Sequence, residues 1–208
     1  MRFRYTILLL SSLAVCYCQT NLLSPVEYVA FIRASENGFI QTESLTNFTV
    51  EAFYQPALYV ALMQSSPEGI KEEPLNASTR RFENFYQFLV SIRCSTNSPI
   101  DEQLGKLCIS KDSFQIKKEI MLYRLQNYFT LVQGADSLAC TFYHAQPSGK
   151  VDNAYHFMVV FETNDKLRYS DKKEVDLKLM YKDPLWFQRD FTFVFSHNTI
   201  QNAPKIKL

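Results

Sequence analysis

Residues that could bind a metal ion or take part in catalysis are few and widely spaced in this sequence. The histidines His144, His156 and His197 stand apart from one another. Cys140 and His144 are four residues apart, but in a strand, which rises about 3.3 Å per residue, they would lie about 13 Å apart, too far to share one ion. The segment 170–173 fits the pattern Ser-x-x-Lys, yet it is a charged, turn-like stretch without the companion motifs of a serine acyl-enzyme. We therefore predict no metal site and no cofactor.

Motifs that define common catalytic sites do not occur in the chain. It has no Gly-x-Ser-x-Gly elbow, no phosphate-binding glycine loop and no His-Glu-x-x-His motif. Glu72 and Glu73 form a small carboxylate cluster in a loop-like segment, whereas glycoside hydrolysis needs two carboxylates on either side of a cleft. The sequence therefore predicts no catalytic residues and favours a protein that is not an enzyme.

One turn-like segment, residues 183–190, carries the only tryptophan of the chain. If Trp186 and Phe187 are exposed beside Arg189, they would form a binding site for a protein partner or a sugar ring. Alternatively, the two aromatic side chains cover one end of a sheet core, because large aromatic residues are mostly buried. The sequence leaves both interpretations open.

The cysteines indicate one candidate disulfide. Cys16 and Cys18 lie near the amino terminus, which leaves Cys94, Cys108 and Cys140 for the folded part. Cys94 and Cys108 bracket a loop-like stretch that a disulfide could close in an oxidising compartment, with a stabilisation of about 3 kcal/mol in the loop-entropy model. Cys140 lies in an apolar, strand-like run, where we expect a buried free thiol.

Residues 1–18 have the features of a secretory signal peptide. Arg2 and Arg4 precede an apolar run at residues 7–15, which matches the basic and apolar regions of such signals. A membrane-spanning helix needs about 20 apolar residues, so this run is too short to remain in a bilayer as an anchor. We expect an exported protein whose mature part, residues 19–208, forms a single domain.

Two modes of signal removal are open. Residues 13–16 resemble a bacterial lipobox, in which cleavage before Cys16 is coupled to acylation of that cysteine, although Val15 stands where the pattern expects Gly, Ala or Ser. Alternatively, Cys16 and Cys18 are the small residues that precede a cut at Gln19. The first mode gives a lipid-anchored protein and the second a soluble one.

The composition is that of an ordinary folded domain with a large aromatic core. Of 208 residues, 47% are hydrophobic, 14% aromatic and 21% charged, which excludes disordered and low-complexity architectures. Lysine and arginine total 22 against 21 for aspartate and glutamate, without a block of one sign. A nucleic-acid partner is therefore not expected.

Hydrophobic periodicity predicts strands and short helices in an order that does not alternate regularly. The expected helices are residues 25–36, 57–64 and 113–123, and the expected strands are residues 39–43, 47–54, 85–94, 128–133, 138–144, 154–162, 174–181 and 191–195. Strands clustered in hairpin order favour an antiparallel sheet. The predicted fold class is α+β, with a curved antiparallel sheet of about six to eight strands and two or three short helices packed on it.

Local signals refine three of these boundaries. Ser24, Pro25 and Glu27 stand where a helix N-cap, the first helical position and a capping-box acid would stand. Residues 134–136 (Gly-Ala-Asp) predict a hairpin turn. The polar segment 65–79, with prolines and a glycine, predicts a loop.

Several blocks of the chain resemble a family of exported proteins of Bacteroidota that are often classified as lipoproteins and have no assigned function. The blocks are residues 23–29 (LSPVEYV) with 36–38 (ENG), 54–62 (YQPALYVAL), 136–144 (DSLACTFYH) and the ending at 191–195 and 200–208. The resemblance implies a location in a bacterial envelope and a non-enzymatic role. It also implies lipidation of a cysteine shortly before the first block, which here is Cys16.

Residues 136–138 (Asp-Ser-Leu) also resemble a motif of Bacteroidota, the acceptor motif for O-glycosylation. Such a modification would be attached to Ser137. Three loosely defined positions match often by chance, and Asp136 could equally bond the backbone of a hairpin turn. We therefore keep Ser137 as a candidate modification site.

Together these features predict a non-catalytic cell-envelope protein, tethered by lipid at Cys16, that acts as an accessory or partner-binding subunit of an outer-membrane or periplasmic assembly. The expected partner is another envelope protein, with the membrane contacted through the lipid anchor. The alternative is a soluble periplasmic module that binds a carbohydrate or an apolar ligand.

Overall fold

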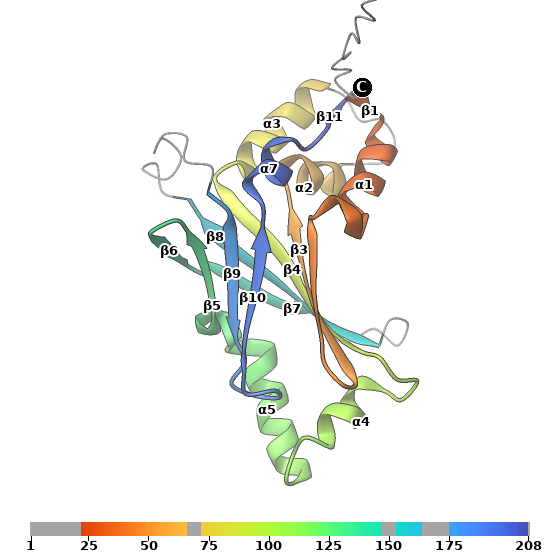
Figure 1. Ribbon diagram of the computed structural model, residues 1–208, viewed down its shortest axis with the longest axis vertical. Coiled ribbons are helices and arrows are strands. Elements are labelled where there is room, and N and C mark those ends of the chain that lie inside the picture. The colour runs from red at the N-terminus through yellow and green to blue at the C-terminus, as the bar shows by residue number, and fades with distance from the viewer. Residues whose placement is uncertain (1–21, 66–71, 147–152, 164–174, 208) are drawn as a thin grey trace, which may run out of the picture.

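The computed structural model describes residues 22–65, 72–146, 153–163 and 175–207 (Figure 1). The expected signal peptide with Cys16 and Cys18, and the segment 170–173, lie outside these residues. The helices are α1 (Pro25–Arg33), η1 (Ser35–Asn37), α2 (Ala57–Gln64), α3 (Glu72–Phe82), α4 (Ile100–Gly105), α5 (Lys111–Tyr123), η2 (Leu125–Tyr128) and α7 (His197–Gln201).

The strands form two antiparallel sheets and one two-stranded clasp. They are β1 (Leu22–Leu23), β2 (Ile40–Ser44), β3 (Phe48–Gln55), β4 (Phe85–Cys94), β5 (Phe129–Gln133), β6 (Asp136–Ala139), β7 (Phe142–Gln146), β8 (Ala154–Glu162), β9 (Leu177–Lys182), β10 (Asp190–Phe195) and β11 (Lys205–Ile206). One sheet has the order β2-β3-β4-β8-β7 and the other β10-β9-β5-β6, while β1 pairs in parallel with β11. The predicted α+β fold class is confirmed.

The chain divides its strands between two sheets at Cys140. One continuous strand is expected at residues 138–144, but β6 pairs with β5 in the four-stranded sheet and β7 pairs with β8 in the five-stranded sheet. The predicted hairpin between β5 and β6 is confirmed, since Gln133 lies opposite Asp136 and Gly134 has a φ of 63°. A left-handed backbone at this position favours glycine.

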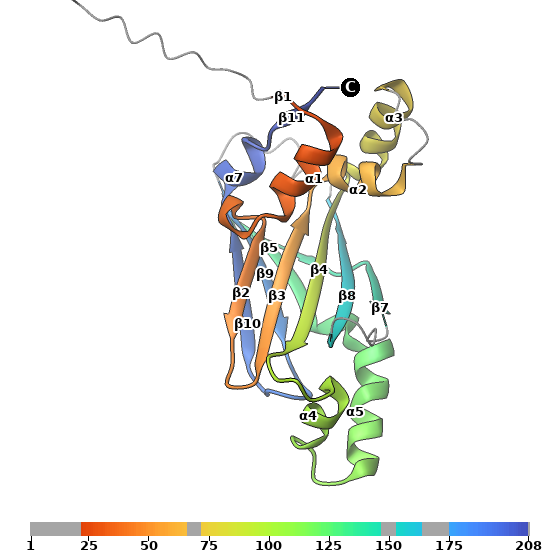
Figure 2. The same cartoon turned by 90° about the vertical axis from the view of Figure 1, so that its right-hand side faces the viewer.

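The two sheets lie face to face and enclose an aromatic core (Figure 2). Alternate residues of β4, among them Phe88 and Val90, are fully buried. Rings of the two sheets meet directly: Phe195 of β10 lies 5.3 Å from Phe88 and 6.1 Å from Tyr54 of β3, centroid to centroid. The high aromatic content of the sequence is thus used to fill the space between two sheets.

Helices cover both ends of the sheets. At the upper end of Figure 1, called the α1 end here, lie α1, α2, α3, α7 and the β1–β11 clasp. At the lower end, called the α5 end, lie α4, α5 and the turns that join β2 to β3 and β9 to β10. The two end groups are separated by the length of the strands.

Two helices occur where the sequence predicts loops. Residues 65–79 are expected to form a loop, but α3 begins at Glu72 and contains Pro74 in its first turn, where proline is tolerated because that N–H needs no helical partner. The stretch between Cys94 and Cys108 holds α4. Both helices are short or polar, so hydrophobic periodicity gives little sign of them.

The candidate disulfide between Cys94 and Cys108 is not formed in the structure, where both cysteines are free thiols. The Cys94 sulfur lies 3.1 Å from the Thr96 hydroxyl, whereas the Cys108 thiol donates to the carbonyl of Leu104 one turn back. The helix α4, which the prediction treated as loop, intervenes between them. Each thiol is therefore engaged within its own segment.

Candidate functional site

The turn between β9 and β10 is built around one buried carboxylate. Asp183 accepts hydrogen bonds from the backbone N–H groups of Leu185, Trp186 and Phe187, and from the Tyr181 hydroxyl at 2.8 Å. Its side chain is almost completely buried. Because four donors converge on it, Asp183 fixes the course of the segment that carries Trp186, Phe187 and Arg189.

This turn forms one wall of an open hollow at the α5 end, here called the Arg189 hollow. Its volume is about 570 Å³. The other walls come from the β2–β3 turn and from Leu107, which follows α4. The lining residues are Ser44, Leu45, Thr46, Asn47, Phe48, Leu107, Trp186, Phe187 and Arg189. The three residues that the sequence singled out thus meet at one site.

Trp186 belongs mostly to the core. Only 5% of the residue is exposed, its ring lies 5.7 Å from that of Phe114, and its indole N–H points to the Met121 sulfur at 3.3 Å. Lys117 of α5 lies over the same ring at 5.5 Å. Of the two interpretations left open by the sequence, burial applies to Trp186, which lines the hollow with very little exposed surface.

Phe187 and Arg189 are more accessible. Phe187 is half-buried, with its ring edge-on to Phe48 at 5.3 Å and to Phe191 at 6.0 Å. Arg189 is exposed, its guanidinium lies 4.7 Å above the Phe191 ring, and it forms a 3.5 Å ion pair with Glu43. Phe187 and Arg189 are therefore accessible and remain candidate binding residues.

The hollow combines an apolar floor with a polar rim and one cation. The side chains of Ser44, Thr46 and Asn47, which carry hydroxyl or amide groups, come from the β2–β3 turn next to Phe48. Such a surface can bury an apolar group and form hydrogen bonds around it. No carboxylate lines it among the described residues, so no acid–base pair of the kind used in hydrolysis is assembled there.

Apolar side chains continue beyond the hollow onto the α4–α5 connection. Leu107, which lines it, is 43% exposed, and Ile109 two residues later is fully exposed. On α5, Ile116 and Tyr123 are also exposed. Exposed apolar side chains also occur at the α1 end, at Leu22, Val26 and Met63, so those near the hollow matter through their position beside it rather than their number.

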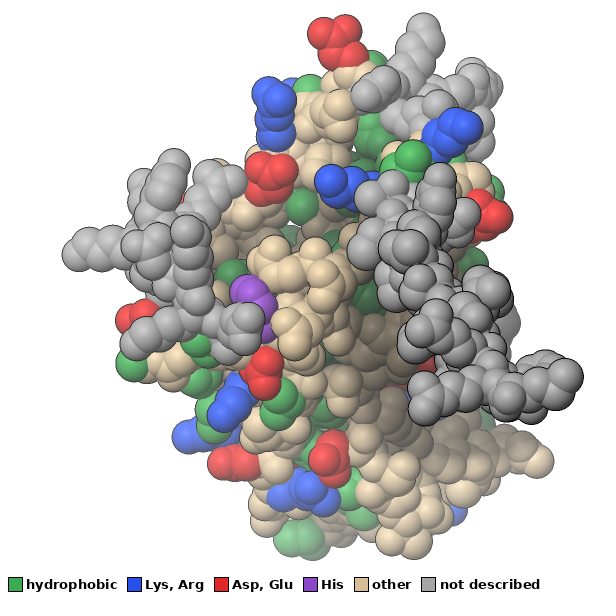
Figure 3. All heavy atoms as spheres, turned by 45° about the horizontal axis from the view of Figure 1, so that its top comes forward, with side chains coloured by type: hydrophobic (Ala, Val, Ile, Leu, Met, Phe, Trp, Pro, Cys, Tyr) green, Lys and Arg blue, Asp and Glu red, His purple; other side chains and the backbone are tan. Residues whose placement is uncertain are grey.

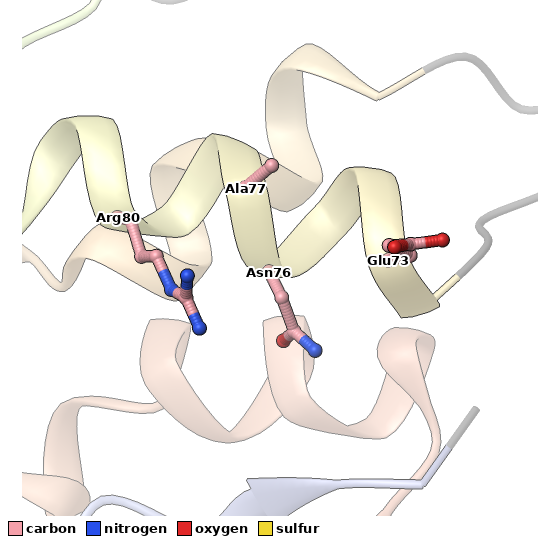
Figure 4. Close-up of a pocket in the computed structure, with 4 residues that line it drawn as sticks. All are labelled: Glu73, Asn76, Ala77 and Arg80. Atoms are coloured by element: carbon pink, nitrogen blue, oxygen red, sulfur yellow. The ribbon is translucent and has the colours of Figure 1, made fainter.

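A second hollow of about 430 Å³ lies along α3 at the α1 end. It is lined by Glu73, Asn76, Ala77 and Arg80, and Figure 4 shows Asn76 and Arg80 pointing from α3 to the side where α1 lies. Glu73, part of the carboxylate cluster noted in the sequence, is exposed at the start of this helix. In Figure 3, which shows this end of the molecule, acidic and basic side chains are interspersed.

Two polar clusters were not foreseen from the sequence. Ser91 of β4 lies beside His156 of the neighbouring strand β8, with 2.8 Å between the serine oxygen and Nδ1. A catalytic serine must be reachable, but Ser91 is only 2% exposed. This pair cannot present a nucleophile to a substrate in this conformation.

The second cluster fastens α4 and α5 to the sheet. Asp101 of α4 accepts hydrogen bonds from the Tyr155 hydroxyl of β8 and from the Lys118 ammonium of α5, the latter at 2.6 Å. Burial is the main cause that raises the pKa of Tyr155, followed by the Asp101 hydrogen bond. Asp101, Lys118 and Tyr155 are far apart in the chain. No local sequence pattern therefore indicates that they meet.

The remaining predicted residues lie apart from the hollow. Cys140 is a buried thiol, as expected, and burial raises its pKa. Ser137 is exposed on β6, an edge strand of the four-stranded sheet, where it is accessible to modification. Among the described residues, no group of three or more His, Cys, Asp and Glu side chains could hold a metal ion.

Comparisons with known proteins identify a distant structural likeness. No protein-family model matches the chain, and no curated protein matches it. A crystal structure of a novel protein of unknown function from Burkholderia pseudomallei K96243 is 10% identical and superposes with a TM-score of 0.41, over 91% of this chain and 98% of the other. That similarity is too low to transfer any property. Within the described segments, no helix is long and apolar enough to cross a membrane.

Proposed function

We propose that this chain is a non-catalytic cell-envelope protein, tethered by lipid at Cys16, that binds another envelope protein as an accessory subunit of an outer-membrane or periplasmic assembly. The observation that carries the proposal is the Arg189 hollow, where Phe187, Arg189 and Leu107 are accessible around a rigid turn. Aromatic and arginine side chains are enriched among the residues that dominate binding between proteins.

The rigidity of the hollow supports a binding role. Asp183 holds the β9–β10 turn through four hydrogen bonds, and the Lys117 ammonium donates to the Leu185 carbonyl at 2.5 Å. A preorganised surface loses little conformational entropy when a partner binds, and therefore binds more tightly.

The position of the hollow also suits a tethered protein. Leu22, six residues after Cys16, begins β1 at the α1 end, and the ten residues of β4 run from that end toward the α5 end. At about 3.3 Å per residue, this strand alone extends about 33 Å. A lipid on Cys16 would hold the α1 end near the membrane and direct the Arg189 hollow away from it.

Site-specific photo-crosslinking in cells that produce the protein tests this proposal. A photoreactive phenylalanine analogue in place of Thr46, which is exposed and lines the hollow, should crosslink to a defined envelope protein. The matched control is the same analogue at Thr192, which is exposed on β10. A product from Thr46 alone supports the proposal, whereas no product, or the same products from both positions, contradicts it.

A second candidate is a soluble periplasmic module that binds a carbohydrate or an apolar ligand. The observation in its favour is the size of the hollow, about 570 Å³, because ligand pockets commonly measure about 300–1,000 Å³. Its rim of hydroxyl and amide groups could bind sugar hydroxyls. Saturable quenching of Trp186 fluorescence by a mono- or oligosaccharide would favour this candidate over a protein partner.

A further inference from the structure

The charge of the Arg189 hollow indicates what kind of group it binds. Among its described lining residues, Arg189 is the one that carries a charge, and the others are apolar, hydroxyl or amide side chains. The hollow therefore places one positive charge, paired with the Glu43 carboxylate beside it, among apolar and uncharged polar side chains. A ligand that complements it carries one negative charge on an apolar body.

Contacts within the chain orient the Arg189 side chain but leave its guanidinium able to bind a ligand. Its guanidinium lies over Phe191, 4.7 Å from the ring centroid, a distance at which a cation and an aromatic ring attract each other. Its ion pair with Glu43 is 3.5 Å long, with side chains 45% and 42% exposed. Exposed pairs of this kind contribute little stability, so an incoming carboxylate can replace Glu43 and accept the two parallel hydrogen bonds that arginine offers.

The apolar surroundings indicate that the carboxylate belongs to a chain that continues on both sides. Phe187 and Leu107 flank the site, and the exposed Ile109 extends the apolar surface past the hollow. A carboxylate at a free chain end has neighbouring residues on one side, whereas a side-chain carboxylate within a segment has them on both sides. Resting on the function proposed above, we infer that the Arg189 hollow binds a glutamate or aspartate side chain within a partner segment whose neighbouring residues are apolar.

Short peptides test this inference directly, with Trp186 as the reporter. It is the only tryptophan of the chain and lines the hollow, so its indole N–H gives a single signal in a ¹H–¹⁵N spectrum. The probes are acetyl-Leu-Glu-Leu-amide, its glutamine counterpart acetyl-Leu-Gln-Leu-amide, and acetyl-Leu-Gln-Leu with a free carboxyl end. We expect the glutamate peptide to shift the signal saturably and to bind about 10-fold more tightly than the glutamine peptide, the size of one charge-assisted contact.

Variants separate the charge from the shape of the site. Arg189→Gln should abolish the preference for glutamate, and Arg189→Lys should keep part of it, because the charge remains without the planar fork. Glu43→Gln should strengthen binding by about 2- to 3-fold, since a competing carboxylate is removed. Arg124→Gln, which removes an exposed arginine paired with Glu119 on α5, is the matched control and should bind like the parent.

Several outcomes would overturn the inference. These are equal binding of the glutamate and glutamine peptides, unchanged selectivity in Arg189→Gln, or binding of the free-carboxyl peptide alone. If the peptides fail while Thr46 still crosslinks to an envelope protein, the acidic-segment inference falls and the proposed function stands. If the Thr46 crosslink is also absent, the proposed function falls as well.

Discussion

Asp183 illustrates how one residue can shape a binding surface without touching the ligand. Its buried carboxylate joins the end of β9 to three consecutive backbone N–H groups and to the hydroxyl of Tyr181. Burial raises the pKa of Tyr181 well above its usual value, and the neighbouring Asp183 raises it further. The Tyr181 proton is therefore retained, and the hydroxyl remains a donor to Asp183 at any physiological pH.

Replacing Asp183 with alanine should destabilise the fold and disorder the hollow. We expect a loss of about 2–4 kcal/mol in the free energy of unfolding, because several buried donors would lose a charged acceptor. Urea unfolding followed by Trp186 fluorescence measures this loss. The matched control, Asp190→Ala, removes an exposed carboxylate at the start of β10 and should change the free energy by less than about 0.5 kcal/mol. Equal effects of the two substitutions would show that the Asp183 bonds do not organise the turn.

At the scale of single residues, the sequence predicts which residues form the site but not how much of each side chain is exposed. Trp186, Phe187 and Arg189 are recognisable as a group because they are adjacent in the chain. Their different burial depends on Met121, Phe114 and Glu43, which are distant in sequence and contact them only after folding. Tertiary contacts of this kind have no local pattern.

At the scale of single elements, α1 shows the closest agreement between sequence and structure. The expected capping box is confirmed: the Ser24 oxygen accepts from the Glu27 N–H, and the Glu27 carboxylate accepts from the Ser24 N–H at 2.8 Å. The hydrogen bond from the Ser24 backbone is the main cause that lowers the pKa of Glu27. The end differs from the predicted 25–36: α1 stops at Arg33 before an extended Ala34, and the left-handed Gly38 instead follows the separate turn η1.

Ser24→Ala should cost about 1 kcal/mol of stability, since it removes the N-cap of α1. Hydrogen exchange should show the loss mainly in the first turn of α1, because the rest of the helix is packed through Tyr28 and Ile32. Ser137→Ala, at an exposed position on β6, serves as the control. If both variants unfold at the parent's urea midpoint, the capping box does not contribute to stability.

Elements that lack an apolar stripe were not predicted. In α3, Leu75 is the buried residue, and the helix is held mainly by its packing on α2. In α4, the six residues are too few for periodicity to be recognised. The break at Cys140 was missed because β6 and β7 follow each other as strands with two residues between them, and their different pairing partners lie elsewhere in the chain.

At the scale of the whole molecule, the aromatic core predicts a specific response to alkaline pH. Burial raises the pKa of Tyr28, Tyr54 and Tyr143 above the ordinary value of 10.0. A raised pKa in the folded state gives stability that is fully present below pH 10 and is lost as the pH rises above it. Each such tyrosine should lower the free energy of unfolding by about 1.4 kcal/mol per pH unit in that range.

Urea unfolding between pH 8 and pH 11.5 measures this dependence. We expect constant stability up to about pH 9.5 and a steep decline above pH 10, with a shallower decline in Tyr54→Phe, which removes one buried hydroxyl. Tyr123→Phe is the control, because Tyr123 is 75% exposed. A flat profile, or equal slopes in the parent and Tyr54→Phe, would contradict the role given to the buried tyrosines.

The start of the described chain and the Arg189 hollow lie at opposite ends of the molecule. The β1–β11 clasp places the start of the described chain at the α1 end, and the Arg189 hollow lies at the α5 end. The sequence predicts the α+β class and most strands, but not the two-sheet arrangement that separates these ends. A tether at Cys16 would turn this separation into an orientation with the hollow facing away from the membrane.

The intact mass of the protein from its native membrane fraction tests the lipid tether most directly. We predict a chain that begins at Cys16 and carries a diacyl or triacyl glyceryl group, with that modification lost in Cys16→Ser and retained in Cys18→Ser. A chain that begins at Gln19 and is recovered in the soluble fraction would contradict the tether and favour a free periplasmic ligand-binding domain.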